Sequence, residues 1–198
     1  SSIRVAAPAS ARWINGPFRR GSAERRGIDW ARSLLEKHGA RIDALAWHEW
    51  MVRSLYATGQ YRTGIQAAAD LVGRDQAGRP RKALLIDQTN ISSGNTVSPY
   101  EQDTNYAALW WASVIINSST DGLLDVLNWF HLVDEPDHLK GLFKVENERE
   151  LRIKQVGLLH GMFSRKWGGN VYRVNNESFE VDVLHTQDKG RHRLFGVN

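Results

Sequence analysis

The stretch Ala83-Leu84-Leu85-Ile86-Asp87 is a run of apolar residues that ends at a carboxylate. Similar runs stand upstream, at Ile3-Arg4-Val5-Ala6-Ala7 and Asp43-Ala44-Leu45-Ala46-Trp47, and another follows at residues 123–129. The runs begin at residues 3, 43, 83 and 123, so they recur about every 40 residues. Apolar runs without alternation are typical of strands that are buried on both faces. The sequence therefore predicts four strands of a parallel sheet.

Segments with helical spacing of apolar residues follow each of these runs. We expect helices over residues 22–38, 50–71, 103–117 and 150–167, with Asp103 as the N-cap of the third. Strands and helices in steady alternation predict parallel strands joined by crossover helices. The expected fold class is therefore α/β.

Residues 169–198 follow a different pattern. Three short segments, at 170–174, 178–185 and 191–197, are separated by turn residues and predict the start of an antiparallel β module. The four preceding units cannot close a (β/α)8 barrel, which has eight strands and typically about 250 residues. The chain is therefore either a small open α/β sheet or the second half of a barrel.

The composition excludes several classes of protein. The chain has 198 residues, of which 41% are hydrophobic and 24% are charged, which excludes disordered and collagen-like chains. It has no cysteine, which excludes disulfide scaffolds, thiolate zinc sites and cysteine nucleophiles. No apolar run approaches the roughly 18 residues of a membrane span. The net charge is +4, and the arginines near the start form no recognisable nucleic-acid module, so we expect neither a membrane nor a nucleic-acid partner.

Polar and aromatic side chains follow the predicted strands, at the end where sites of parallel α/β folds gather. Tryptophan faces stack on sugar rings, while imidazole, amide and carboxylate groups bind hydroxyls, so this edge is suited to carbohydrate. Trp110 and Trp111 lie within a predicted helix and are expected to pack. The charged residues at 134, 135, 137 and 138 lack the spacing of a metal loop, so we expect no metal there. The expected substrate-binding residues are His48, Glu49, Trp50, Asn90, Trp129 and Asp134.

The order of these motifs resembles the second half of a clan A glycoside hydrolase, most closely family 39 with its xylosidases and iduronidases. The resemblance rests on Ala6-Ala7-Pro8 for strand five, Trp47-His48-Glu49-Trp50 for strand six, residues 86–90 for strand seven, residues 129–134 for strand eight, and Lys140-Gly141-Leu142-Phe143. It implies strands five to eight of a TIM barrel over residues 1–168 and the start of a β-sandwich over residues 169–198.

The resemblance also implies a function. It predicts hydrolysis of O-glycosidic bonds in an oligosaccharide or polysaccharide by a retaining two-carboxylate mechanism, without a cofactor, in a secreted or periplasmic protein. The expected partners are the carbohydrate substrate and an N-terminal half-barrel, which lies on a missing segment or on a partner chain. On this reading the chain exposes a large apolar edge that this half would cover.

Two departures from the family pattern affect the chemistry. Gln88 stands where the nucleophilic glutamate belongs, and a neutral amide is a poor nucleophile. Asp87 is the alternative, but neighbours on a strand point to opposite faces, so Asp87 and Gln88 share the site only if the strand bulges. The Asn-Glu pair that carries the acid/base glutamate after strand four is absent from the expected position, so the acid would come from the other half.

Two other functions stay open at this level. The chain is a non-catalytic carbohydrate-binding protein on the same scaffold if Gln88 is its natural residue and the tryptophans serve only for stacking. It is a structural or interaction domain if the tryptophans form a protein interface. Whether the chain is an enzyme is therefore uncertain from the sequence, with glycoside hydrolysis as the favoured reading.

Overall fold

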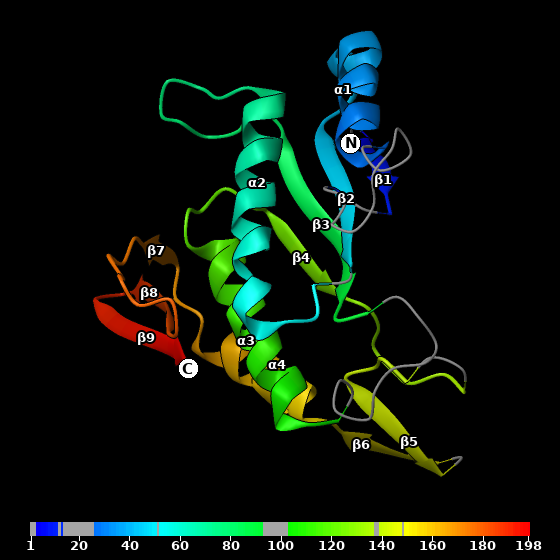
Figure 1. Cartoon of the computed structure of the whole chain (residues 1–198), viewed down its shortest axis with the longest axis vertical. Helices are drawn as coiled ribbons and strands as arrows, with labels where there is room; N and C mark the ends of the chain where they lie inside the picture. Colours follow the sequence, from blue (N-terminus) through cyan, green and yellow to red (C-terminus); the bar gives the residue numbers. More distant parts are fainter. Residues whose placement is uncertain are drawn as a thin grey trace.

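The computed structural model describes residues 3–11, 13, 26–50, 52–92, 103–136, 139–147 and 149–198. Its main sheet has four strands in the order β1-β2-β3-β4, and all three pairings are parallel (Figure 1). The strands are β1 (Ala6–Ser10), β2 (Ala44–Trp50), β3 (Ala83–Asn90) and β4 (Val126–Trp129). The predicted parallel α/β arrangement is therefore confirmed.

Four α-helices accompany the sheet. They are α1 (Arg26–His38), α2 (Gly59–Val72), α3 (Asn105–Ser119) and α4 (Gln155–Lys166), and short 3₁₀ helices occupy Gly39–Arg41 and Leu55–Ala57. The first three helices join consecutive parallel strands, as crossover connections must. Helices α2 and α3 lie side by side along the sheet (Figure 1).

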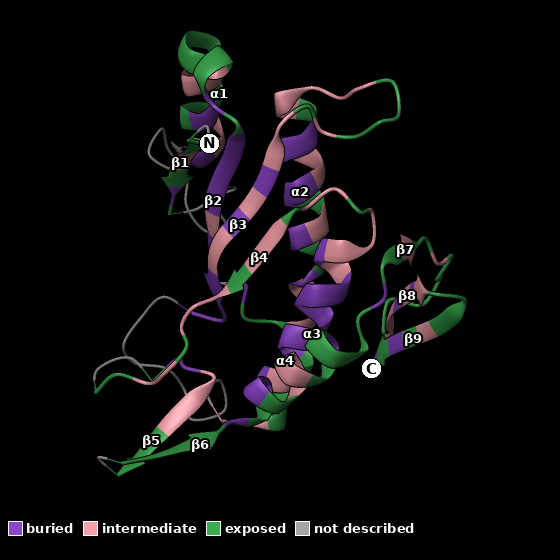
Figure 2. Cartoon of the chain, turned by 180° about the vertical axis from the view of Figure 1, so that it is seen from behind, coloured by how far each residue is buried: buried purple, intermediate pink, exposed green. Residues whose placement is uncertain are grey.

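The hydrophobic core lies between the sheet and these helices. Leu45, Leu84 and Ile86 on the strands are buried together with Ile65 of α2 and Val114 of α3. Figure 2 shows buried segments in β2, β3, α2 and α3 in purple. Because side chains alternate along a strand, the intervening residues of β2 and β3 point to the opposite face. We call this opposite face, which bears Ala46, His48 and Gln88, the open face of the sheet.

The helices predicted over residues 50–71 and 103–117 begin later than expected. The helix expected from residue 50 begins at Gly59, because β2 continues through Trp50 in register with Asn90 of β3. The N-cap of α3 is Thr104 rather than Asp103, and the Thr104 hydroxyl accepts a hydrogen bond from the Ala107 amide at 3.3 Å. Asp103 instead forms an ion pair with Arg152.

The prediction of a helix over residues 150–167 is wrong in its first turn. Residues Glu150–Ile153 form β6, which pairs antiparallel with β5 (Phe143–Asn147), and α4 starts only at Gln155. Leu151 and Ile153 are two positions apart and therefore also fit a strand. Pairing with β5 favours the strand over the helix, because β5 gives the backbone of residues 150–153 hydrogen-bond partners that the first turn of a helix lacks.

The C-terminal residues form a separate three-stranded antiparallel sheet with the order β7-β8-β9. Its strands are β7 (Asn170–Tyr172), β8 (Asp182–Asp188) and β9 (Arg191–Val197), so β8 lies later than the expected 178–185. Lys189 and Gly190 both have positive φ, of 46° and 77°, which suits a two-residue turn between β8 and β9. The ring of Phe195 stacks on Phe163 of α4 with centroids 4.6 Å apart, which ties this sheet to the helices.

The boundary between residues 168 and 169, and the continuation of this sheet into a β-sandwich, remain predictions. Among the described residues, no helix is long and apolar enough to cross a membrane.

Candidate functional site

The candidate site lies at the carboxyl ends of β2 and β3, on the open face. His48 is in register with Gln88, Glu49 with Thr89, and Trp50 with Asn90. Partners in a parallel register share a face, so the side chains of His48 and Gln88 lie on the same side of the sheet. Thr89 lies on the other side, where its hydroxyl contacts the Tyr61 hydroxyl of α2 at 2.6 Å.

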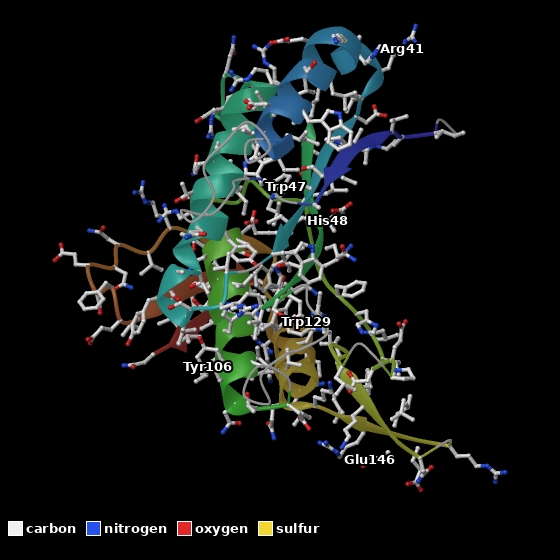
Figure 3. The ribbon with its side chains drawn as sticks, turned by 45° about the vertical axis from the view of Figure 1, so that its right-hand side comes forward. Arg41, Trp47, His48, Tyr106, Trp129 and Glu146 are labelled. Carbon is white, nitrogen blue, oxygen red and sulfur yellow. The ribbon has the colours of Figure 1, made fainter. Side chains whose placement is uncertain are left out.

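A β-bulge in β3 brings a third side chain to the open face. Trp47 is in register with Ile86, but the next residue, His48, is in register with Gln88, so Asp87 is the extra residue. The pairing with β4 shifts at the same place, between Ile86 and Thr89. The Asp87 Oδ1 atom lies 3.5 Å from Nε2 of His48, which is labelled on the sheet in Figure 3. Because of the bulge, the side chains of Asp87 and Gln88 lie on the same face, which regular alternation along a strand would not allow.

The carboxyl group of Asp87 is only partly satisfied by its surroundings. Its Oδ1 atom is buried and accepts no hydrogen bond from the described residues. Burial raises the pKa of Asp87 above its ordinary value, and positive charge on His48 acts in the opposite direction. The side chains of His48 and Asp87 are 25% and 30% exposed, so a ligand can still reach them. A carboxyl group with a perturbed pKa next to an imidazole is a frequent feature of functional sites.

An aromatic pair stands next to these groups. The ring of Trp50 meets the edge of Phe130, just beyond β4, with centroids 5.6 Å apart. The ammonium group of Lys140 lies 5.8 Å from the centre of the Trp50 ring. Sequence reasoning named Trp129 and missed Phe130, although alternation along β4 allows only one of these two neighbours to face the site.

Two of the expected substrate-binding residues face the helices instead. Glu49 is only 7% exposed and lies near Tyr61, whose pKa is raised mainly by burial and further by the Glu49 charge. The ring of Trp129 packs on Trp111 of α3 with centroids 5.0 Å apart, and its Nε1 donates to the carbonyl of Lys140 at 2.8 Å. The structure therefore does not bring Glu49 or Trp129 together with His48.

Asn90 and Asp134 hold the chain segment that follows β4. The side-chain amide of Asn90 donates to the carbonyls of Phe130 and Lys140. Asp134 forms an ion pair with Lys154 at 2.6 Å, with side chains only 5% and 1% exposed, and it also accepts from the Gly141 amide. These polar groups are bonded within the protein, so their observed role is structural.

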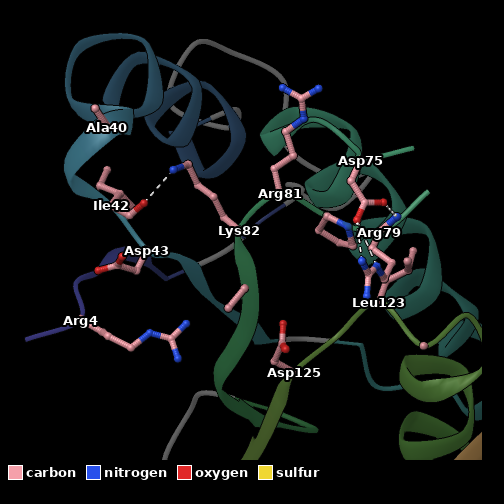
Figure 4. A pocket seen from close by; sticks show the side chains of 13 residues that line it. Arg4, Ala40, Ile42, Asp43, Asp75, Arg79, Arg81, Lys82, Leu123 and Asp125 are labelled. Carbon is pink, nitrogen blue, oxygen red and sulfur yellow. Dashed lines mark hydrogen bonds and ion pairs between the residues drawn. The ribbon is translucent and has the colours of Figure 1, made fainter. Parts of the chain in front are cut away.

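A cavity lies at the other end of the sheet. It has a volume of about 620 Å³ and includes Arg4, Asp43, Lys82 and Asp125 in its lining (Figure 4). Lys82 donates to the carbonyls of Gly39 and Ile42, while Asp43 and Asp125 accept from backbone amides of Val5 and Leu84. At the amino ends of barrel strands such contacts serve stability rather than catalysis.

The described residues contain no cluster of three or more His, Cys, Asp or Glu side chains that could hold a metal ion. Residues 137 and 138, which belong to the charged segment considered in the sequence, lie outside the described residues.

The chain matches no protein-family model and no curated protein, but it does match solved structures. One is a family 51 α-L-arabinofuranosidase from Bifidobacterium longum, with a TM-score of 0.69 and 13% identity over 99% of this chain and 45% of that one. Another is a GH39 β-xylosidase from Caulobacter crescentus, with a TM-score of 0.58 and 17% identity over 97% of this chain and 38% of that one.

Both neighbours are clan A glycoside hydrolases. The chain therefore has a glycoside hydrolase-like fold of the TIM-barrel type, as the resemblance predicted. It spans less than half the length of either neighbour. The preference for family 39, and the assignment to the C-terminal half, stay predictions.

Proposed function

We propose that the chain forms the C-terminal half of the catalytic barrel of a glycoside hydrolase that cleaves O-glycosidic bonds in an oligosaccharide or polysaccharide. The observation that carries the proposal is the bulge in β3, which gathers Asp87, Gln88 and His48 on the open face at the carboxyl end of the sheet. The fold supports it, because the solved neighbours are glycoside hydrolases. A carboxylate at this edge is the first requirement for the reaction.

In this mechanism Asp87 is the nucleophile, because the neutral amide of Gln88 is a poor nucleophile. A retaining glycosidase needs one carboxylate to attack the anomeric carbon and a second carboxyl group, about 5 Å away, to protonate the leaving oxygen. Asp87 in its ionised form supplies the first: burial raises the pKa of Asp87, and positive charge on His48 counteracts that shift and so favours the ionised form. Gln88 offers an amide that donates a hydrogen bond to a sugar hydroxyl.

The remaining parts of the site come from two sources. Trp50, steadied by the edge contact with Phe130, supplies an aromatic surface for the sugar ring. The acid/base carboxyl group comes from a second four-stranded β/α half, on the same polypeptide or on a partner chain, which pairs with β1 and β4 and covers the open face. We further propose a secreted or periplasmic protein, since polysaccharide substrates lie outside the cell.

The test uses a polypeptide that contains both halves. We expect hydrolysis of arabinofuranosides or xylosides, measured with chromogenic glycosides, to fall at least about a thousandfold in Asp87→Asn, which removes the nucleophile. Asp70→Asn is the control, because it makes the same substitution at an exposed carboxylate on α2, which packs on the other face of the sheet. Full activity in Asp87→Asn would refute the assignment of the nucleophile.

A second function is favoured by one observation, the neutral amide of Gln88 at the position that the resemblance gives to the nucleophile. On this alternative the chain binds saccharides without cleaving them. Calorimetry would then show oligosaccharide binding and no turnover with either Gln88 or Gln88→Glu. On the catalytic proposal, the protein with Gln88 unchanged already hydrolyses glycosides, and Asp87→Asn removes that turnover. Absence of saccharide binding together with a stable complex with another protein would instead favour an interaction domain.

A further inference from the structure

The segment between β4 and β5 carries a buried lysine beside the aromatic surface proposed for the sugar ring. The ammonium group of Lys140 lies over the ring of Trp50, 5.8 Å from its centre, and Lys140 is only 4% exposed. A cation over the face of an indole ring attracts it, and the attraction is stronger where water is excluded. Lys140 therefore restrains the Trp50 ring at a place that solvent hardly reaches.

The position of Lys140 is itself fixed by the ends of two strands. Its ammonium group donates to the backbone carbonyl of Ser92, which lies two residues beyond β3. Its own carbonyl accepts from Nε1 of Trp129 at 2.8 Å and from the side-chain amide of Asn90 at 3.3 Å. Because both the backbone and the end of the side chain are held, the ammonium group offers the Trp50 ring a fixed partner rather than a mobile one.

The Trp50 ring lies next to the groups proposed for the chemistry. Trp50 follows His48 by two positions in β2, so both side chains lie on the open face. Trp50 is only partly buried, so part of its ring is accessible to a ligand. A ring that is already ordered before the sugar arrives loses less conformational freedom on binding, and the affinity is correspondingly higher.

We propose that Lys140 is a positioning residue for saccharide binding, which holds the Trp50 ring in the orientation in which a sugar stacks on it. The inference rests on the proposed function, because that function makes Trp50 the sugar platform. It also gives Trp129 and Asn90 an indirect part in binding, since both hold the backbone of Lys140.

The first measurement needs no ligand. In the 198-residue chain, the indole N–H signal of Trp50 is identified by NMR as the one that Trp50→Phe removes. We expect its order parameter to fall from about 0.85, typical of a rigid N–H group, to below about 0.6 in Lys140→Gln. Glutamine keeps an N–H donor for the Ser92 carbonyl but places no charge over the ring. Lys140→Met, which removes the donor as well, should mobilise the ring at least as much.

The second measurement is the affinity for xylo-oligosaccharides, determined by calorimetry on the polypeptide that contains both halves. Lys140→Gln should weaken binding by about fivefold. Trp50→Ala should weaken it more, and the double variant no more than Trp50→Ala alone, because a residue that acts through the ring has no effect once the ring is gone. The kcat for chromogenic glycosides should stay within about twofold in Lys140→Gln, since the sugar contacts the ring equally in the ground state and the transition state.

Lys144→Gln is the matched control, because it makes the same substitution at an exposed lysine of β5. It should leave the Trp50 signal and the affinity unchanged, and circular dichroism verifies the fold of each variant. The proposal is overturned if the Trp50 order parameter is unchanged in the Lys140 variants, if neither of them folds, or if the losses of affinity in the double variant are additive. A mobile Trp50 ring in these variants, together with no saccharide binding by the unchanged protein, would support the restraint of the ring and refute the proposed function.

Discussion

Two carboxylates near the carboxyl ends of two neighbouring strands, Asp87 of β3 and Asp134 after β4, have opposite surroundings. Asp134 has an ammonium partner in Lys154, a backbone donor in Gly141 and almost no exposure. Asp87 has a buried oxygen that accepts no hydrogen bond from the described residues and lies 3.5 Å from the imidazole of His48. Buried polar groups are ordinarily satisfied, so an unsatisfied one needs an explanation. The difference separates a carboxylate that holds the fold together from one that is available for chemistry.

The largest loss of stability is expected at Asp134, whose carboxylate has an ammonium partner and a backbone donor. Asp134→Ala leaves the buried ammonium of Lys154 without its charged partner, and loss of one member of a buried ion pair costs about 3–5 kcal/mol. Urea unfolding at pH 7 measures this loss. Asp103→Ala is the control at an exposed pair with Arg152, where the loss should stay within about 1 kcal/mol. Equal losses at the two positions would contradict the structural role of Asp134.

The next effect distinguishes two tryptophans that the sequence treated alike. Trp129→Ala removes a ring that packs on Trp110 and Trp111 and should destabilise the protein by about 3 kcal/mol. Trp50→Ala removes a ring that contacts the edge of Phe130 and the ammonium group of Lys140, and it should cost less in stability but more in saccharide binding. Thermal unfolding and calorimetric titration with xylo-oligosaccharides measure the two quantities. A larger loss of stability in Trp50→Ala, or a larger loss of saccharide binding in Trp129→Ala, would contradict the roles given to the two rings.

The smallest effect on stability is expected at Asp87, and it has the opposite sign. Burial raises the pKa of Asp87 in the folded state, so the ionised form is disfavoured there relative to the unfolded chain. Asp87→Asn removes this penalty and should slightly raise the melting temperature at pH 7. The penalty is absent at a pH below the unfolded carboxyl pKa, where both states are protonated, and it appears as the pH rises through the folded pKa. The two proteins should therefore melt together in acid and separate toward neutral pH.

The comparison also shows which parts of the site a sequence can predict. Spacing placed His48 and Trp50 at the end of one strand and Asp87 at the end of the next, because apolar runs mark strands and polar residues follow them. It placed Glu49 and Trp129 in the same group, since position after a strand does not say which face a side chain takes. The pairing of the strands decides the face. Glu49 and Trp129 are both in register with Thr89, and the contact of Thr89 with Tyr61 of α2 shows that this face is the one toward the helices.

Local pattern by itself determined the parallel α/β class, the order of the four strands along the chain and the antiparallel tail, since each depends on the period of apolar residues and on turn chemistry. Only the tertiary structure decided three other features: the bulge at Asp87, the start of α4 at Gln155 and the ion pair of Asp134 with Lys154. The reason is the same in each case. These features arise from contacts between segments distant in the chain, and such contacts choose among conformations that the local sequence permits equally.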